Sequence, residues 1–123
     1  MLIKSLTKNR TLAKNAAFCD DIFSKFIGLM FSKNKKKALI FKFKKEKIIH
    51  LHMLFVFYSI DVLFLDKNKI VVDIKGNFRP FAFYKSKKKA MYAVELPNGI
   101  IKRTKTEIGD KIEIWNNKKG MDC

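Results

Sequence analysis

Four polar side chains inside or beside apolar segments are the first residues of this chain that could do chemistry. His50 and His52 are two residues apart, so in a strand both imidazoles lie on one face. Two imidazoles offer two metal ligands, and Asp61 or Glu95 could supply a third. Alternatively, the histidines are structural and hydrogen-bonded to backbone. Because Asp61 falls on the opposite face if the strand is straight, we favour the structural role and predict no metal site.

Asp61 and Glu95 each interrupt an apolar strand pattern. A buried carboxylate must be paired, hydrogen-bonded or protonated. Asp61 is therefore either a general base or ligand group, or a structural carboxylate that accepts backbone N–H bonds after the bend at 58–59. Glu95 is open to the same two interpretations. As a pair they could do acid–base or glycosidic chemistry, but nothing in the sequence brings them into contact.

The motifs that usually identify an enzyme are missing from the sequence. It contains no nucleophile elbow, no phosphate-binding glycine loop and no zinc-protease helix. The sequence therefore favours a protein that is not an enzyme, and it predicts no cofactor.

The chain is strongly basic, with a formal net charge of +16 from 27 Lys and Arg against 11 Asp and Glu. Such a charge suggests binding to nucleic acid or another polyanion. The alternative is that Lys is the generic surface residue of a Lys-rich chain, which the spread of the lysine clusters along the sequence favours. Arginine, which makes bidentate contacts with carboxylates and phosphates, occurs only as Arg10, Arg79 and Arg103.

Three lysine clusters lie beside aromatic residues, which include Phe83 and Tyr84. Lysines next to exposed aromatic rings are typical of a platform for single-stranded nucleic acid. If the rings face inward, the same pattern is only a set of solvated turns. The candidate contacts to a polyanion are Lys35, Lys36, Lys37, Lys44, Lys45, Lys87, Lys88 and Lys89.

The elements that must position these residues are mostly strands. Short apolar or alternating segments between turn residues predict a compact, mainly β domain at 1–115, a sandwich or barrel with one or two short helices. The expected strands are 1–6, 38–43, 48–57, 60–65, 70–75, 90–96 and 111–115, with 11–19 also compatible with β structure. Short helical segments are expected at 21–27 and 99–104, turns at 44–47 and 66–69, and a long loop at 76–89. Residues 116–123 are expected to be a frayed polar tail.

The apolar run 50–66 is long enough to raise the question of a membrane span. It contains two histidines and Asp61, and it is rich in Phe and β-branched residues. Two adjacent buried strands joined by a bend at 58–59 explain it better than a spanning helix, so we predict no membrane span. Cys19 and Cys123 form no disulfide framework or CxxC motif, and the N-terminus lacks an apolar signal segment, so we expect a cytoplasmic protein.

Several segments resemble the signatures of an uncharacterised conserved family known as domain of unknown function 192. They are 28–31 (G-L-M-F), 52–66 (an H-M run ending in I-D-V-L-F-L-D), 92–99 (Y-A-V-E-L-P-N-G) and 108–110 (I-G-D). The resemblance spans about residues 10–115 and implies a compact, mostly β domain without an established activity. Two departures are Ser59, where the family usually has Pro, and Lys25, where the family often has Arg closer to G-L-M.

We therefore hypothesise a non-enzymatic binding domain for a small molecule or peptide, held at one end of the β structure. Its candidate binding residues are Lys25, Met30, His52, Asp61 and Glu95. Polyanion or nucleic-acid binding through the lysine turns is the first alternative. The second is a metal-dependent or hydrolytic enzyme that uses His52 with Asp61 or Glu95.

Overall fold

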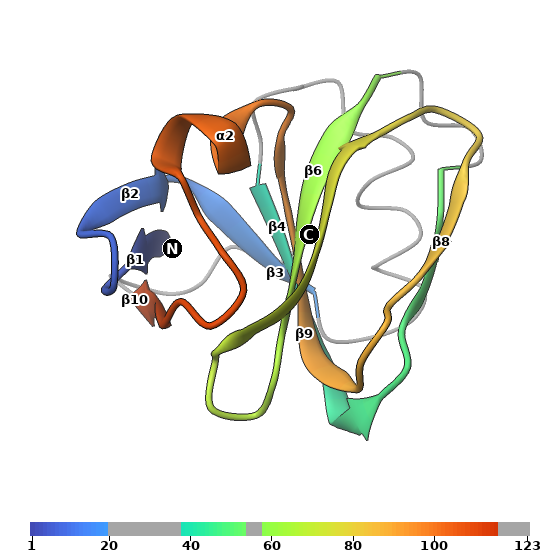
Figure 1. Cartoon of the computed structure of the whole chain (residues 1–123), viewed down its shortest axis with the longest axis horizontal. Coiled ribbons are helices and arrows are strands. Elements are labelled where there is room, and N and C mark those ends of the chain that lie inside the picture. Colours follow the sequence, from blue (N-terminus) through green and yellow to red (C-terminus); the bar gives the residue numbers. More distant parts are fainter. Residues whose placement is uncertain (20–37, 54–57, 116–123) are drawn as a thin grey trace.

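The computed structural model describes residues 1–19, 38–53 and 58–115, which form ten strands and one short helix (Figure 1). The prediction of a mainly β domain is confirmed, and the sheets are open rather than closed into a barrel. The elements are β1 (Leu2–Ser5), β2 (Arg10–Ala13), β3 (Ala16–Cys19), β4 (Ala38–Lys47), β5 (His50–His52), β6 (Ile60–Leu65), β7 (Val71–Phe78), β8 (Phe83–Lys85), β9 (Ala90–Pro97), α2 (Ile100–Thr104) and β10 (Ile112–Trp115).

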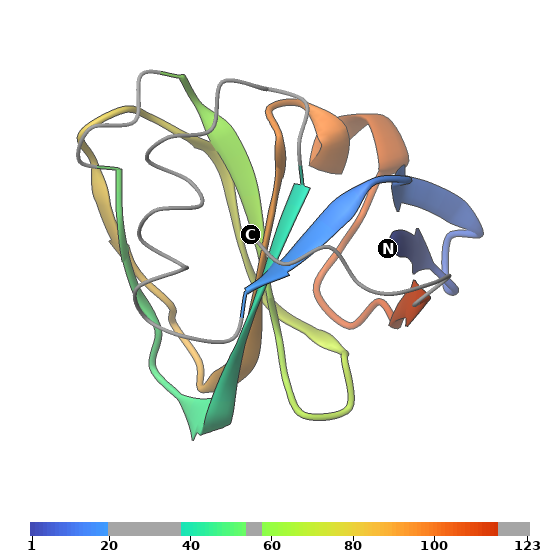
Figure 2. The same ribbon diagram turned by 180° about the vertical axis from the view of Figure 1, so that it is seen from behind.

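A five-stranded sheet in the order β3-β4-β9-β6-β7 forms the centre of the molecule. Only the β3–β4 pair is parallel, and the other neighbours are antiparallel. A small sheet, β10-β1-β2, lies on one side together with α2, and the β5–β8 pair lies on the other (Figures 1 and 2). Both faces of the central sheet are therefore covered.

This coverage explains why the central strands lack a polar face. All six residues of β6 are buried, and Leu63 and Leu65 pack in the core on the β1–β2 side. Val62 and Phe64 point the other way, into the core beneath β5 and β8. A strand buried on both faces is apolar at every position, and here the exception is Asp61.

The hairpin predicted between residues 62–65 and 70–72 is confirmed, with Leu65 opposite Val71. Asp66 closes its turn, since Oδ1 of its carboxylate accepts the backbone N–H groups of Asn68 at 2.8 Å and Ile70 at 3.0 Å. The pairing continues further than predicted, as far as Ile60 opposite Phe78. The predicted strand 60–65 and the predicted helical turn at 99–104 are also present, as β6 and α2.

Three sequence predictions were wrong. Residues 44–47 are not a turn but the end of β4, because Lys47 pairs with Ala90 of β9. The expected long loop 76–89 contains the end of β7 and all of β8. The predicted strand 48–57 is reduced, in its described part, to the three residues of β5, which pair with β8 and not with β6. Pairing partners far away in the sequence decide all three cases, and local composition does not reveal them.

The helix predicted at 21–27 and the tail at 116–123 lie outside the described residues. Among the residues that the structure does describe, no helix has the length and apolar character needed to cross a bilayer.

Candidate functional site

Asp61 is a buried carboxylate with both oxygens engaged by backbone N–H groups. Oδ1 accepts the N–H of Asn77 at 3.0 Å, and Oδ2 accepts the N–H groups of Gly99 and Ile101, each at 3.0 Å. The side chain is only 3% exposed. Gly99 has a φ of 95°, a left-handed conformation that glycine adopts without strain. Asp61 therefore ties the end of β7 and the start of α2 to β6. This arrangement matches the interpretation of Asp61 as a structural carboxylate that accepts backbone N–H bonds.

Glu95 is also buried, at 3% exposed, but its surroundings are apolar. It lies on β9 opposite Leu39 of β4 and Val62 of β6, both of which belong to the core beneath β5 and β8. Oε2 has no hydrogen-bond partner among the described residues. Burial raises the pKa of Glu95 to about 8, so the carboxyl group is mainly protonated at neutral pH.

The two carboxyl groups lie on opposite faces of the central sheet. Asp61 is paired with Leu96, which packs in the core on the β1–β2 side, whereas Glu95 is paired with Val62 of the other core. Directly opposed residues of an antiparallel pair share a face. A carboxylate pair of Asp61 and Glu95 working on one substrate is therefore not formed. Within residues 1–19, 38–53 and 58–115, no three His, Cys, Asp or Glu side chains cluster as metal ligands.

His50 and His52 share the exposed face of β5, as their spacing predicts. They are paired with Lys85 and Phe83 of β8, and the rings of His52 and Phe83 are 6.3 Å apart between centroids. This face points away from the central sheet, because the intervening Leu51 packs on the core. The structure thus separates His52 from Asp61 and Glu95, both of which are buried in the central sheet.

The remaining predicted binding residues divide into two groups. Lys25 and Met30 lie outside the described residues, as do Lys35, Lys36 and Lys37. The other candidate lysines are exposed, at the end of β4 and in the turn between β8 and β9: Lys44, Lys45, Lys87, Lys88 and Lys89.

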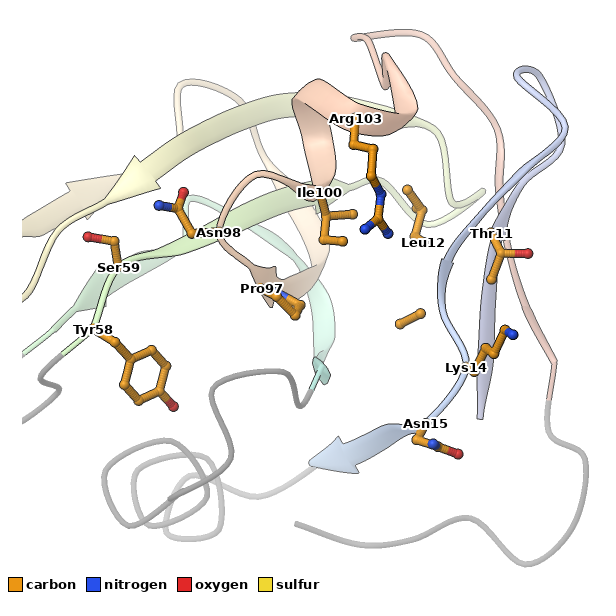
Figure 3. Close-up of a pocket in the computed structure, with 11 residues that line it drawn as sticks. Thr11, Leu12, Lys14, Asn15, Tyr58, Ser59, Pro97, Asn98, Ile100 and Arg103 are labelled. Atoms are coloured by element: carbon orange, nitrogen blue, oxygen red, sulfur yellow. The ribbon is translucent and has the colours of Figure 1, made fainter.

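A cavity of about 910 Å³ lies at the end of the central sheet where β9 leads into α2 (Figure 3). Its walls come from residues 11–15 of β2 and the following turn, from residues 58–59 before β6, and from residues 97–103. Asp61 holds the third wall in place, since its partners Gly99 and Ile101 are neighbours of the lining residues Asn98 and Ile100.

Of the described residues that line the cavity, the charged ones, Lys14 and Arg103, are basic. Arg103 extends from α2 towards the space between α2 and β2, beside Leu12 and Ile100 (Figure 3). Neither Arg103 nor Lys14 makes a hydrogen bond or ion pair with the described part of the chain, and no acidic side chain of that part lines the cavity. Among the described residues, the cavity therefore carries two basic side chains, both exposed to solvent, and no acidic one. The sequence did not predict this cavity. Arg103 could have drawn attention only as one of the three arginines of the chain.

Comparison with known proteins identifies the family and the fold of this chain, and it establishes no activity for the cavity. The family model of domain of unknown function 192 (DUF192), described as an uncharacterized ACR, matches residues 4–114. The chain belongs to the DUF192 family. A DUF192 relative named UPF0127 protein, from Pyrococcus furiosus, is 40% identical over 114 residues, which are 91% of this chain and 96% of the relative. Another UPF0127 protein, from Thermococcus sibiricus, is 40% identical over 92% of this chain and 73% of its own length.

Two crystal structures share the DUF192 fold of this chain. One is described as a putative transcription regulator from Sinorhizobium meliloti, with a TM-score of 0.80 and 22% identity over 91% of this chain and 89% of the other. The other is a protein of unknown function from Novosphingobium aromaticivorans, with a TM-score of 0.78 and 17% identity over 92% and 82% of the two chains. At these identities the similarity shows the fold alone. The function of this DUF192 chain is not established.

Proposed function

We propose that the chain is a non-enzymatic binding domain, and that the cavity between β2, residues 58–59 and α2 holds a small anionic ligand. The ligand would carry a carboxylate or phosphate group, on a small molecule or at the end of a peptide. The observation that carries the proposal is Arg103, whose guanidinium extends towards a cavity that no described acidic side chain lines. A planar guanidinium binds both oxygens of a carboxylate or phosphate at once.

The size and lining of the cavity support this proposal. A volume of about 910 Å³ is within the range of small-molecule sites, which are roughly 300–1,000 Å³. Leu12, Pro97 and Ile100 supply apolar walls, while Ser59 and Asn98 supply uncharged hydrogen-bonding groups. Apolar walls with a few polar groups that fix orientation are typical of ligand sites.

The arrangement of the carboxyl groups supports binding over catalysis. Both oxygens of Asp61 are engaged by backbone N–H groups, so the residue is poorly placed to accept a proton from a substrate. Glu95 lies on the other face of the central sheet, in the core beneath β5 and β8. As proposed, the domain works in the cytoplasm and acts through occupancy of the cavity.

The proposal predicts a specific loss of affinity in Arg103→Gln. We expect Arg103→Gln to weaken binding about tenfold or more, because a hydrogen bond to a charged group contributes about 1.5–3 kcal/mol. Inorganic phosphate and glutarate serve as probes in a ¹H–¹⁵N NMR titration, which reports both affinity and location. Shifts should concentrate at residues 11–15, 58–59 and 97–103. Arg103→Lys should restore only part of the affinity, since Lys is a point charge.

Arg10→Gln is the matched control, because Arg10 is exposed on β2 and does not line the cavity. It removes the same charge and should leave the probe affinities unchanged. Equal losses in both variants would reduce the effect to net charge and contradict a built site. Shifts that map away from the cavity would contradict it as well.

A further inference from the structure

Two lysine clusters that are far apart in the sequence meet at the end of the central sheet opposite the cavity. Lys47 at the end of β4 is paired with Ala90 at the start of β9, directly after the lysine turn 87–89. β9 then runs from Ala90 to Pro97, which lines the cavity. In Figure 1 the start of β9 and the end of β4 are at the bottom of the molecule, and α2 is at the top.

The lysine turn is held by buried groups and is not a loose loop. Ser86 is buried, and its Oγ accepts the N–H of Ile49 at 2.9 Å and donates to the carbonyl of Lys88 at 2.8 Å. The buried carboxylate of Asp73 accepts the backbone N–H of Lys87 at 2.8 Å and the hydroxyl of Tyr84 at 2.7 Å. Burial and the neighbouring Asp73 raise the pKa of Tyr84 to about 12, which keeps its hydroxyl a donor. The lysine side chains thus extend from a fixed backbone.

The β5–β8 pair adds aromatic groups beside these lysines. His50, His52, Phe83 and Lys85 share its outward face. Phe83 is 71% exposed, more than any other large hydrophobic side chain in the described residues. Tyr84, between Phe83 and Lys85, points inward to the core. Because its ring is exposed, Phe83 contributes little to the packing of the core.

Two carboxylates of the described residues, Asp73 and Glu46, lie beside these lysines, and both accept backbone N–H groups. Within residues 42–52 and 81–90 the only acidic residue is Glu46. Its Oε2 already accepts the backbone N–H of Lys67 at 2.9 Å. The surface therefore combines exposed lysines with an exposed ring, an imidazole and a fixed backbone.

We infer that this surface, formed by the end of β4, the outward face of β5–β8 and the turn 87–89, binds single-stranded nucleic acid. The lysines contact phosphates, and the exposed ring of Phe83, which lies beside His52, supplies a stacking surface for unpaired bases. A single strand fits better than a duplex or a simple polyanion, because only a single strand offers both phosphates and accessible base faces. This inference is independent of the anion cavity, which lies at the other end of β9.

The test compares fluorescence-anisotropy binding of a single-stranded dT₂₀, a U₂₀ RNA, a 20-base-pair duplex and heparin to the whole chain. We expect both single strands to bind more tightly than the duplex or heparin at equal salt. Phe83→Ala should weaken single-strand binding about 5- to 150-fold, which is the effect of removing one base-stacking interaction. Phe83→Tyr keeps the ring and should keep most of the affinity. Because Phe83 is exposed, neither change should affect folding.

Charge is tested separately by the double variant Lys87→Gln with Lys88→Gln. We expect it to lower the slope of log affinity against log salt by about 1.4, or about 0.7 for each phosphate that a lysine no longer neutralises. The matched control is Lys102→Gln with Lys105→Gln, which removes two exposed lysines around α2 at the other end of the molecule and should leave the slope unchanged. Equal slopes in both double variants, equal binding of heparin and dT₂₀, or no effect of Phe83→Ala would each overturn the inference. So would an absence of binding at low salt.

Discussion

Asp61→Ala is expected to lower the free energy of unfolding by about 3–5 kcal/mol. The substitution removes a carboxylate that is only 3% exposed and that accepts three part-buried backbone N–H groups, from Asn77, Gly99 and Ile101. Each buried donor left unsatisfied costs about 1–3 kcal/mol. Asp61→Asn should be nearly as damaging, since its single oxygen replaces two acceptors and its amide N–H₂ faces backbone donors. Urea denaturation of the three proteins measures the effect.

Asp66→Ala is the matched control for this prediction. Asp66 also accepts two backbone N–H groups, from Asn68 and Ile70, but its hairpin turn is open to solvent. Water can replace the missing acceptor there, so the expected cost is only about 1 kcal/mol. If Asp61→Ala costs no more than Asp66→Ala, Asp61 does not hold α2 and β7 in place. A general base at Asp61 would then regain weight.

The segments predicted correctly are those whose sequence carries the whole signal. β6 is a short apolar run between Ser59 and a turn whose Asp66 closes it locally, so both of its ends can be located from the sequence. α2 follows Pro97, Asn98 and Gly99, a breaker sequence that ends β9. In these cases the deciding interactions lie within a few residues.

The segments predicted wrongly depend on distant partners. The end of β4 consists largely of lysines, which suggest a turn, yet it is held in the sheet by pairing with the start of β9, more than 40 residues further along the chain. β8 is three residues long and exposed on one face, and it exists because β5 pairs with it. The apolar run 50–66 suggests two adjacent strands, but its two parts belong to different sheets. No local pattern distinguishes these outcomes.

The candidate site shows the same division. The two carboxylates are visible in the sequence because each interrupts an apolar strand, and both are buried as that pattern implies. Their positions on opposite faces follow from the register of β6 with β9, which the sequence does not specify. The cavity joins residues 11–15 to residues 97–103. A site assembled from segments this far apart carries no motif, so Arg103 could be recognised only as one of three arginines.

Glu95→Gln is expected to abolish a fall in stability that the wild-type protein shows as pH rises from about 5 to about 8. Burial raises the pKa of Glu95 from 4.5 to about 8, so between these values the folded state holds one proton more than the unfolded state. Stability therefore decreases with rising pH, by up to about 1.4 kcal/mol per pH unit for this group, and levels off above pH 8. Glutamine has the same shape and no charge, so it removes this dependence.

The measurement is the difference in free energy of unfolding between Glu95→Gln and wild type, obtained by urea denaturation at each half unit from pH 5 to pH 9. Other titrating groups are common to both proteins and cancel in this difference. This difference should be small near pH 5 and grow to several kcal/mol in favour of the variant at pH 8–9.

Glu113→Gln is the control, because Glu113 on β10 is half-exposed. Its difference from wild type should vary far less with pH. A flat difference for Glu95→Gln would mean that the carboxylate is charged in the folded protein and has a polar partner. Glu95 would then return as a candidate for ligand binding on the β5–β8 side of the sheet, separate from the Arg103 cavity.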